Sequence, residues 1–97
     1  MVKRPYFNTI STTTAGGSVS LPSGLKILYI TNDDDTNFTK ISINAAIGTA
    51  NNDEATILAT KSLDFTNSCE QIGGNNLTLY FKADTAAVAV TIIGYIS

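Results

Sequence analysis

Apolar and polar residues alternate with a period of two along most of this chain, in runs of five to nine residues. Gly, Pro, Asn and Asp separate the runs, and β-branched residues, which pack well on a pleated surface, are abundant within them. The pattern predicts strands over 6–14, 18–21, 25–31, 38–44, 56–67, 77–83 and 86–97. No long window keeps a helical period of 3.6 residues. A turn of helix at 53–60, capped by Asp53, stays as an alternative to a strand there.

The same alternation predicts which side chains face the core. Leu25 and Ile27 share a phase with Tyr29, so Tyr29 is predicted to lie in the core. Tyr80 has the opposite phase to its neighbours and is predicted to face outward, and Gly94 is expected to mark a bulge or bend. Leu77, Leu79 and Phe81 are also expected to point inward. In the last strand Val88, Val90 and Ile92 are expected to share one face, and Ala89, Thr91 and Ile93 the other.

These strands predict an all-β fold, a single antiparallel β-sandwich or jelly-roll-like barrel of about six to eight short strands. The 97 residues are expected to form one domain, 1–97, in which 1–15 is an extended N-terminal arm or an edge strand. The segments 25–44 and 77–96 each contain two strands around a short polar loop, a pattern that is typical of hairpins.

Charge and the length of the apolar runs argue against two classes of partner, nucleic acid and membrane. Only 14% of the residues are charged, the formal net charge is −2, and no basic stripe runs along the chain, so binding to nucleic acid is not expected. No run approaches the roughly 18 apolar residues of a membrane span. The N-terminus also lacks the apolar segment of a signal peptide, so synthesis in a cytoplasm is expected.

A weakly charged surface can lie against copies of itself without strong repulsion.

Few residues could support catalysis. Histidine is absent, which removes the commonest general base and the commonest zinc ligand. The single cysteine, Cys69, has no histidine partner and is expected to be a small apolar residue. We therefore predict a protein that is not an enzyme and that needs no cofactor.

The segment TNDDDTN at 31–37 is the main candidate for a metal site. A calcium loop of the helix-loop-helix type needs oxygen ligands at its first, third and fifth positions, which here are Asp33, Asp35 and Asn37. The sixth position, Phe38, should be Gly, and the twelfth, Asn44, should be Glu. We favour a solvated loop tip, because Asn and Asp tolerate turn geometry.

A looser Ca²⁺ site remains an alternative, since loops of a β-sandwich can gather carboxylates from two places. The second place would be Asp53–Glu54. Ca²⁺ is thus a candidate cofactor but not the favoured prediction.

Two regions are candidates for contact with other proteins. Lys3 and Arg4 concentrate positive charge next to the aromatic residues Tyr6 and Phe7, in a segment that could add as a strand to a neighbour's sheet edge. The alternatives are a first strand of its own sandwich or a frayed tail. An outward Tyr80 would serve either as a contact residue or as a cross-strand partner on a solvated face.

Three segments resemble small β-sandwich virion structural proteins of tailed bacteriophages, of the capsid decoration or head-associated type. The segments are SLPSGLKILYITNDDDT, ATKSLDFTN and GGNNLTLYFKADTAAVAVTIIGYIS. Within them the resemblance rests on Ile30–Asp33, Ser62–Phe65, Leu79–Ala83 and Val90–Tyr95. The stretch 45–55 and the Thr-rich start depart from the pattern.

The resemblance implies a non-enzymatic structural component of a phage virion that stabilises the particle through protein–protein contacts. Its partners would be the major capsid protein or other virion proteins, in multiple copies or as a homo-oligomer, and its location the virion. The alternative is a carbohydrate- or receptor-binding β-sandwich module of a phage fibre or a bacterial surface adhesin. Its ligand would then lie on the loops 31–37, 45–55 and 67–76.

Overall fold

The fold is an antiparallel β-sandwich, as the alternating pattern predicts. A computed structural model describes residues 4–43, 54–66, 73–74 and 78–96. The strands are β1 (Arg4–Thr12), β2 (Gly17–Ser20), β3 (Leu25–Asn32), β4 (Thr39–Ile43), β5 (Glu54–Ile57), β6 (Ser62–Asp64), β7 (Gly73–Gly74), β8 (Thr78–Ala83) and β9 (Val88–Ile96). Among the described residues, no helix is long and apolar enough to cross a membrane.

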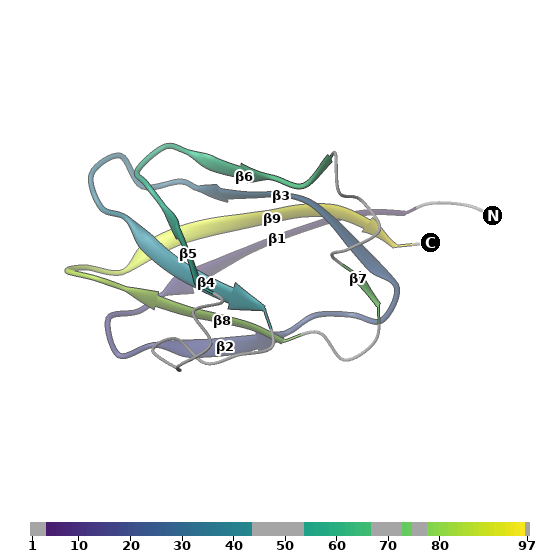
Figure 1. The fold of residues 1–97 in the computed structure, drawn as a ribbon, viewed down its shortest axis with the longest axis horizontal. Coiled ribbons are helices and arrows are strands. Elements are labelled where there is room, and N and C mark those ends of the chain that lie inside the picture. The colour runs from purple at the N-terminus through teal and green to yellow at the C-terminus, as the bar shows by residue number, and fades with distance from the viewer. Residues whose placement is uncertain (1–3, 44–53, 67–72, 75–77, 97) are drawn as a thin grey trace.

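Two sheets face each other across the core (Figure 1). Sheet A has the strand order β1-β9-β3-β6, with β7 paired to part of β3, and sheet B has the order β2-β8-β4-β5. Leaving β7 aside, the first strand pairs with the last, the second with the one before it, and so on inward to β4 with β5. This nested pairing, divided alternately between two sheets, is the strand order of a jelly roll.

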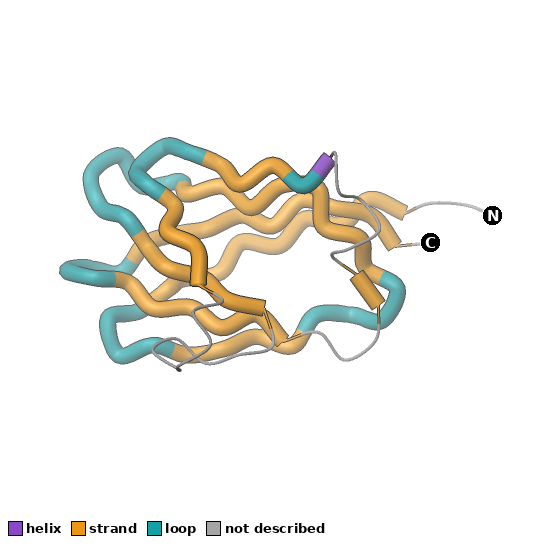
Figure 2. The backbone as a smooth tube through the Cα atoms, viewed as in Figure 1, coloured by secondary structure: helices purple, strands orange, loops and turns teal. Residues whose placement is uncertain are grey.

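The core lies between the sheets and is built from the inward phase of each strand. Leu79 has no exposed surface, which confirms the inward phase predicted for it. Val88, Val90 and Ile92 share one face as predicted, and their complete burial shows that this is the inner face of β9. The remaining buried apolar residues are Leu21, Leu25, Ile27, Ile30, Ile41, Ile57, Phe81 and Ala83. The tube in Figure 2 shows that most loops gather at the end of the sandwich opposite the chain termini.

The prediction of hairpins at 25–44 and 77–96 is wrong. β3 belongs to sheet A and β4 to sheet B, and β8 and β9 are divided in the same way. The loops 33–38 and 84–87 therefore cross from one sheet to the other. Alternation specifies that a segment is a strand with one buried face, but it does not specify which strand lies beside it. Which strands pair is decided by the nested order described above, in which strands distant in the sequence lie side by side.

The prediction that Tyr29 lies in the core is also wrong, because a bulge shifts the phase of β3. The register against β9 changes between Ile27, which is opposite Gly94, and Tyr29, which is opposite Ile93. Leu28 is the extra residue, so Ile30 takes the next inward position and Tyr29 is 37% exposed. The expectation that Gly94 marks a bulge is confirmed.

The structure also decides between the strand and the turn of helix that the sequence allowed at 53–60. Glu54–Ile57 forms β5, which pairs antiparallel with β4, so the helical alternative is wrong for these residues. The β-branched Ile57 fills a core position with 1% exposure. Burial of Ile57 in the core and pairing with β4 therefore stabilise Glu54–Ile57 as a strand. Asp53, the predicted helix cap, lies outside the described residues.

We predict that Gly94→Ala destabilises the protein strongly. A Cβ atom at this position would collide with the backbone carbonyl oxygen of Lys26, and backbone atoms at the bulge cannot rotate away as a side chain can. The free energy of unfolding should fall by about 2 kcal/mol or more in chemical denaturation. Ala89→Ser, at an exposed position of the same strand, is the control and should stay within about 0.5 kcal/mol. Equal stabilities would contradict this account of the bulge.

Candidate functional site

The loop that carries TNDDDTN is anchored by the buried side chain of Asn32. Asn32 is 1% exposed, and its Nδ2 donates to the carbonyl oxygens of Asn37 (2.9 Å) and Ile57 (3.0 Å). Its Oδ1 accepts from the backbone N–H of Asp34 at 2.8 Å. One amide thus joins the end of β3 in sheet A to the end of β5 in sheet B and folds the loop back over itself.

The carboxylate of Asp34 closes the same loop. Its Oδ2 accepts from the backbone N–H groups of Thr36 (2.9 Å) and Asn37 (2.5 Å). These two hydrogen bonds favour the charged form and hold the pKa of Asp34 below its usual value, Asn37 contributing most. In the same way the hydroxyl and backbone N–H of Thr66 lower the pKa of Asp64.

The candidate metal ligands on this loop are each engaged elsewhere. Asp33 Oδ2 accepts from the Thr91 hydroxyl at 2.5 Å, and Asp35 Oδ1 accepts from the Thr36 hydroxyl at 2.9 Å. Asn37 Oδ1 accepts from Thr85 at 3.0 Å, which ties this loop to the neighbouring crossing loop. Within the described ranges, no three His, Cys, Asp or Glu side chains come together as a metal site requires.

Of the proposed second source of carboxylates, Asp53–Glu54, only Glu54 is described, and it pairs with Ser42 at the end of β4 away from this loop. Asp53 is outside the described residues, and Glu54 Oε1 is 3.8 Å from Lys40 Nζ on the outer face of sheet B. The arrangement of TNDDDTN therefore serves to satisfy backbone groups where the chain leaves one sheet for the other.

β1 forms one edge of sheet A, so the predicted N-terminal arm is an edge strand of its own sandwich. It pairs with β9 along its whole length, from Arg4 opposite Ile96 to Thr12 opposite Val88. Tyr6 is half-buried and packs against the core, whereas Phe7 is 70% exposed and Arg4 is exposed. Lys3, the remaining candidate of this segment, lies outside the described residues, as does Cys69.

Phe7 is the first member of an apolar row across the outer face of sheet A. Phe7 is opposite Ile93 of β9, and Ile93 is opposite Tyr29 of β3. We call these three residues the outer row. Sequence reasoning found Phe7 but missed Tyr29, because the bulge that turns it outward has no signal in β3 itself. The Gly94 signal on the partner strand could have revealed the shift.

A row of hydroxyl groups lies beside the outer row. Thr9 and Thr91 are 3.0 Å apart between their Oγ1 atoms, and Thr31 Oγ1 is 2.8 Å from Ser62 Oγ. These hydroxyls bond one another across the strands, and Thr91 also reaches Asp33 at 2.5 Å. The outer face of sheet A thus combines an apolar strip with a polar strip whose groups are already paired.

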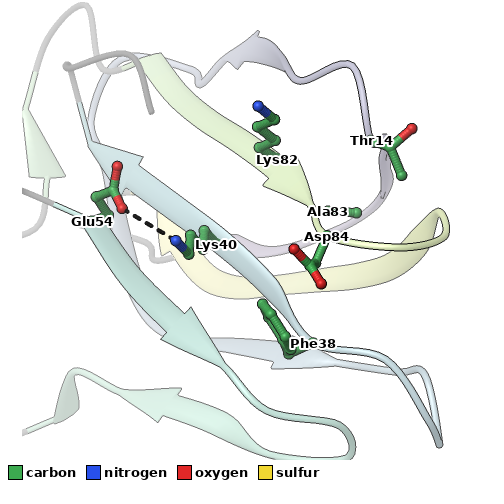
Figure 3. Close-up of a pocket in the computed structure, with 7 residues that line it drawn as sticks. All are labelled: Thr14, Phe38, Lys40, Glu54, Lys82, Ala83 and Asp84. Carbon is green, nitrogen blue, oxygen red and sulfur yellow. Dashed lines mark ion pairs between the residues drawn. The ribbon is translucent and has the colours of Figure 1, made fainter. Parts of the chain in front are cut away.

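The outer face of sheet B carries a charged hollow of about 490 Å³ (Figure 3). Lys40 and Lys82 line it and are directly opposite each other on β4 and β8, a like-charge pair that costs a few tenths of a kcal/mol or more. The rest of the lining is Thr14, Phe38, Glu54, Ala83 and Asp84. Glu54 offsets Lys40, and Asp84 supplies a second negative charge, so the hollow is mixed in charge.

Tyr80, the last contact candidate, belongs to this second sheet. It is half-buried and lines a smaller hollow of about 290 Å³ together with Ser18 and Lys82. In register it is flanked by Ser18 on β2 and Ser42 on β4. Tyr80 therefore lies on the opposite sheet from Arg4, Tyr6 and Phe7, and the structure does not bring the four into one surface.

Comparisons of the chain with protein-family models, with curated proteins and with solved structures found no match.

We predict that Asn32→Ala destabilises the protein by about 2–3 kcal/mol, because the N–H of Asp34 and the carbonyl of Ile57 lose their partner in a buried site. Chemical denaturation measures the change. Asn8→Ala is the control, since half-buried Asn8 makes one side-chain hydrogen bond, to Tyr6 at 3.2 Å, and its loss should cost under about 1 kcal/mol. A smaller loss for Asn32→Ala than for the control would contradict the role of Asn32 as the anchor.

The lowered pKa of Asp34 predicts a loss of stability in acid. The folded pKa lies below the usual 3.8, so the contribution of this carboxylate is fully present well above pH 3.8 and disappears as the pH falls through the lower folded value. Unfolding midpoints measured from about pH 6 to about pH 2 should therefore fall less steeply for Asp34→Asn than for the native chain. A variant with the same pH dependence as the native chain would show that the two N–H bonds do not stabilise the charged form.

Proposed function

We propose that this protein is a non-enzymatic structural component of a bacteriophage virion, of the capsid decoration or head-associated type. It would stabilise the particle by contacts with the major capsid protein or other virion proteins. The sequence resemblance points to this class, and the fold is compatible with it. Jelly rolls build many viral capsid domains, although they also build lectins and cupins, so the fold supports the proposal by analogy only.

The observation that carries the proposal is the outer row on sheet A. Phe7, Ile93 and Tyr29 form an apolar strip across three neighbouring strands, and two of these side chains are exposed by 70% and 37%. Grouped apolar side chains on a small protein typically mark a contact with another protein. Aromatic residues such as Phe7 and Tyr29 are also the side chains that interface centres favour.

A contact made through only a few apolar side chains is weak, and a particle protein can function with weak contacts. A symmetric shell presents the same binding surface many times, so contacts that are weak one by one add up through multivalency. The three members of the outer row are uncharged, so burying them removes no charge from water. Asp64 of β6, exposed and directly opposite Tyr29, places a carboxylate at the end of the row. The contacts would then depend on shape and apolar burial.

A second candidate function is a carbohydrate- or receptor-binding module of a phage fibre or a bacterial adhesin. The charged hollow on sheet B favours it, because Lys40 and Lys82 flank a concave surface that also includes the Phe38 ring. The loop 31–37 is occupied by its own hydrogen bonds, and much of 45–55 and 67–76 lies outside the described residues. Among the described residues, the hollow is the concave surface that such a ligand would fit.

Co-sedimentation with phage particles tests the proposed function. Purified particles of the source phage that lack the protein are mixed with the native chain or with Tyr29→Ser, which removes the aromatic ring from the middle of sheet A's outer face. We expect the native chain to sediment with particles and the variant to bind at least about tenfold more weakly, because the ring is lost from the buried contact. Leu58→Ser, at a side chain that is 59% exposed away from the row, is the control and should bind like the native chain.

The opposite result would favour the second candidate. If the native chain does not sediment with particles but binds a glycan array, and if Lys82→Ala abolishes that binding, the virion role is wrong. Absence of the protein from purified virions by mass spectrometry would also contradict it.

A further inference from the structure

β1 is the longest free edge in the described part of the sandwich. The edge strands of the two sheets are β1 and β6 in sheet A and β2 and β5 in sheet B. β1 has nine residues, whereas β6 has three and β2 and β5 have four each. An edge strand presents unpaired N–H and C=O groups, so a long edge is a template on which another strand can pair.

The sequence of β1 does little to prevent such pairing. Natural edges are usually blocked by charged residues, by Pro or by bulges. Arg4 is the only charged residue of β1 and lies at its first position, and Pro5 follows it. The register against β9 is continuous from Arg4 to Thr12, so no bulge twists the edge away. Residues 6–11 carry no blocking feature, whereas Thr12 is fully buried and ends the open part of the edge. Phe7 adds an exposed apolar side chain beside this edge.

We propose that β1 pairs antiparallel with β1 of a second copy of this chain, with Asn8 on the two-fold axis. This register places residue 4 opposite residue 12 and centres the pairing on the part of β1 that is open to solvent, because Thr12 at the end of the strand has no exposed surface. A contact that uses the same strand on both partners closes on itself as a two-fold dimer. Pro5 lacks an N–H, so the hydrogen-bonded part is centred on residues 6–10.

The side chains of β1 are complementary to themselves in this register. Tyr6 falls opposite Ile10 of the second copy, and Ile10 falls opposite its Tyr6, so two aromatic–aliphatic cross-strand pairs form. Both residues are half-buried and already pack against the core of their own copy. The second copy would thus cover the part of each side chain that the monomer leaves open at the flank of the sandwich.

Charge also permits the second copy. Each Arg4 falls opposite the uncharged Thr12, and the two Arg4 residues are about 27 Å apart along the strands, farther than the screening length in physiological salt. β9, the next strand, has no charged residue. The dimer joins two copies of sheet A into one continuous sheet and places both outer rows on the same face, because a two-fold axis perpendicular to a sheet preserves its faces.

The inference rests on the proposed function for its biological role, where it names a second copy as one of the partners. Its physical content is tested on the purified chain alone. A dimer in solution that is missing from virions would leave the pairing standing and overturn the virion role. A strictly monomeric chain that binds particles would overturn the pairing and leave the virion role standing.

Sedimentation velocity over a range of concentrations is the first test. The native chain should show a concentration-dependent dimer, and Phe7→Lys should raise its dissociation constant at least about tenfold, because it places two charges near the centre of the pairing. Leu58→Lys, at the other strongly exposed apolar side chain, should dimerise like the native chain. Circular dichroism of both variants checks that they fold. A native chain that stays monomeric up to about millimolar concentration, or an unchanged dissociation constant for Phe7→Lys, would overturn the inference.

Cysteine cross-linking tests the register independently of stability. In a Cys69→Ser background, Asn8→Cys places two thiols directly opposite each other, within the Cα separation of about 4.4–6.8 Å that a disulfide allows. Arg4→Cys, on the same strand and exposed, places the thiols about 27 Å apart and is the control. Under mild oxidation Asn8→Cys should form a covalent dimer much faster than Arg4→Cys. Equal rates would overturn the proposed pairing.

Discussion

The fold depends on supplying hydrogen-bond partners where the chain passes from one sheet to the other. At such a crossing the backbone leaves the ladder of its sheet, and its N–H and C=O groups would be buried without partners. Asn32 solves this at the end of β3, where one amide bonds three backbone groups from the loop and from β5. Near the same end, Thr39 Oγ1 of sheet B lies 2.9 Å from Thr12 Oγ1 of sheet A, and both are fully buried. Short polar side chains therefore hold the two sheets together where apolar packing alone would leave backbone groups unsatisfied.

The sequence predicted the strands well because burial on one face imposes a period of two. Leu79 is predicted and found in the core for this reason, and Val88, Val90 and Ile92 share one face as predicted, which the structure shows to be the buried one. Pairing could not be predicted in the same way, since β3 and β4 have the pattern of a hairpin and yet belong to different sheets. The choice depends on whether the polar loop turns within a sheet or crosses between sheets. The crossing at 33–38 is fixed by Asp34, which bonds the backbone of its own loop, and by Asn32, whose partner Ile57 lies on β5 and is not visible in the local sequence.

The candidate site was predictable only in part, again for a physical reason. Phe7 is predicted as a contact residue because it lies beside Lys3 and Arg4 in a candidate edge strand, and it is 70% exposed on β1. Tyr29 does not follow from alternation, because a single extra residue in β3 reverses the faces of everything after it. The acidic loop is interpreted from sequence as a solvated loop tip, with Asp33, Asp35 and Asn37 as the alternative metal ligands. The sequence could not show the donors that these side chains find: Asp33 accepts a hydrogen bond from Thr91, which is distant in the chain, and Asp35 accepts one from its neighbour Thr36.

The bulge links the requirements of the core to the surface on which the proposed function depends. Gly94 allows the backbone of β9 to approach Lys26 so closely that no side chain fits, and this close approach accompanies the extra residue in β3. The shift that follows brings Ile30 and Asn32 to the inside, where Asn32 can reach the crossing loop, and turns Tyr29 to the outside beside Ile93. Without the bulge, Tyr29 would occupy a core position and the polar anchor would point to solvent. The bulge beside Gly94 therefore links how the sheets are joined at their loop end to which aromatic side chain is exposed on the outer face of sheet A.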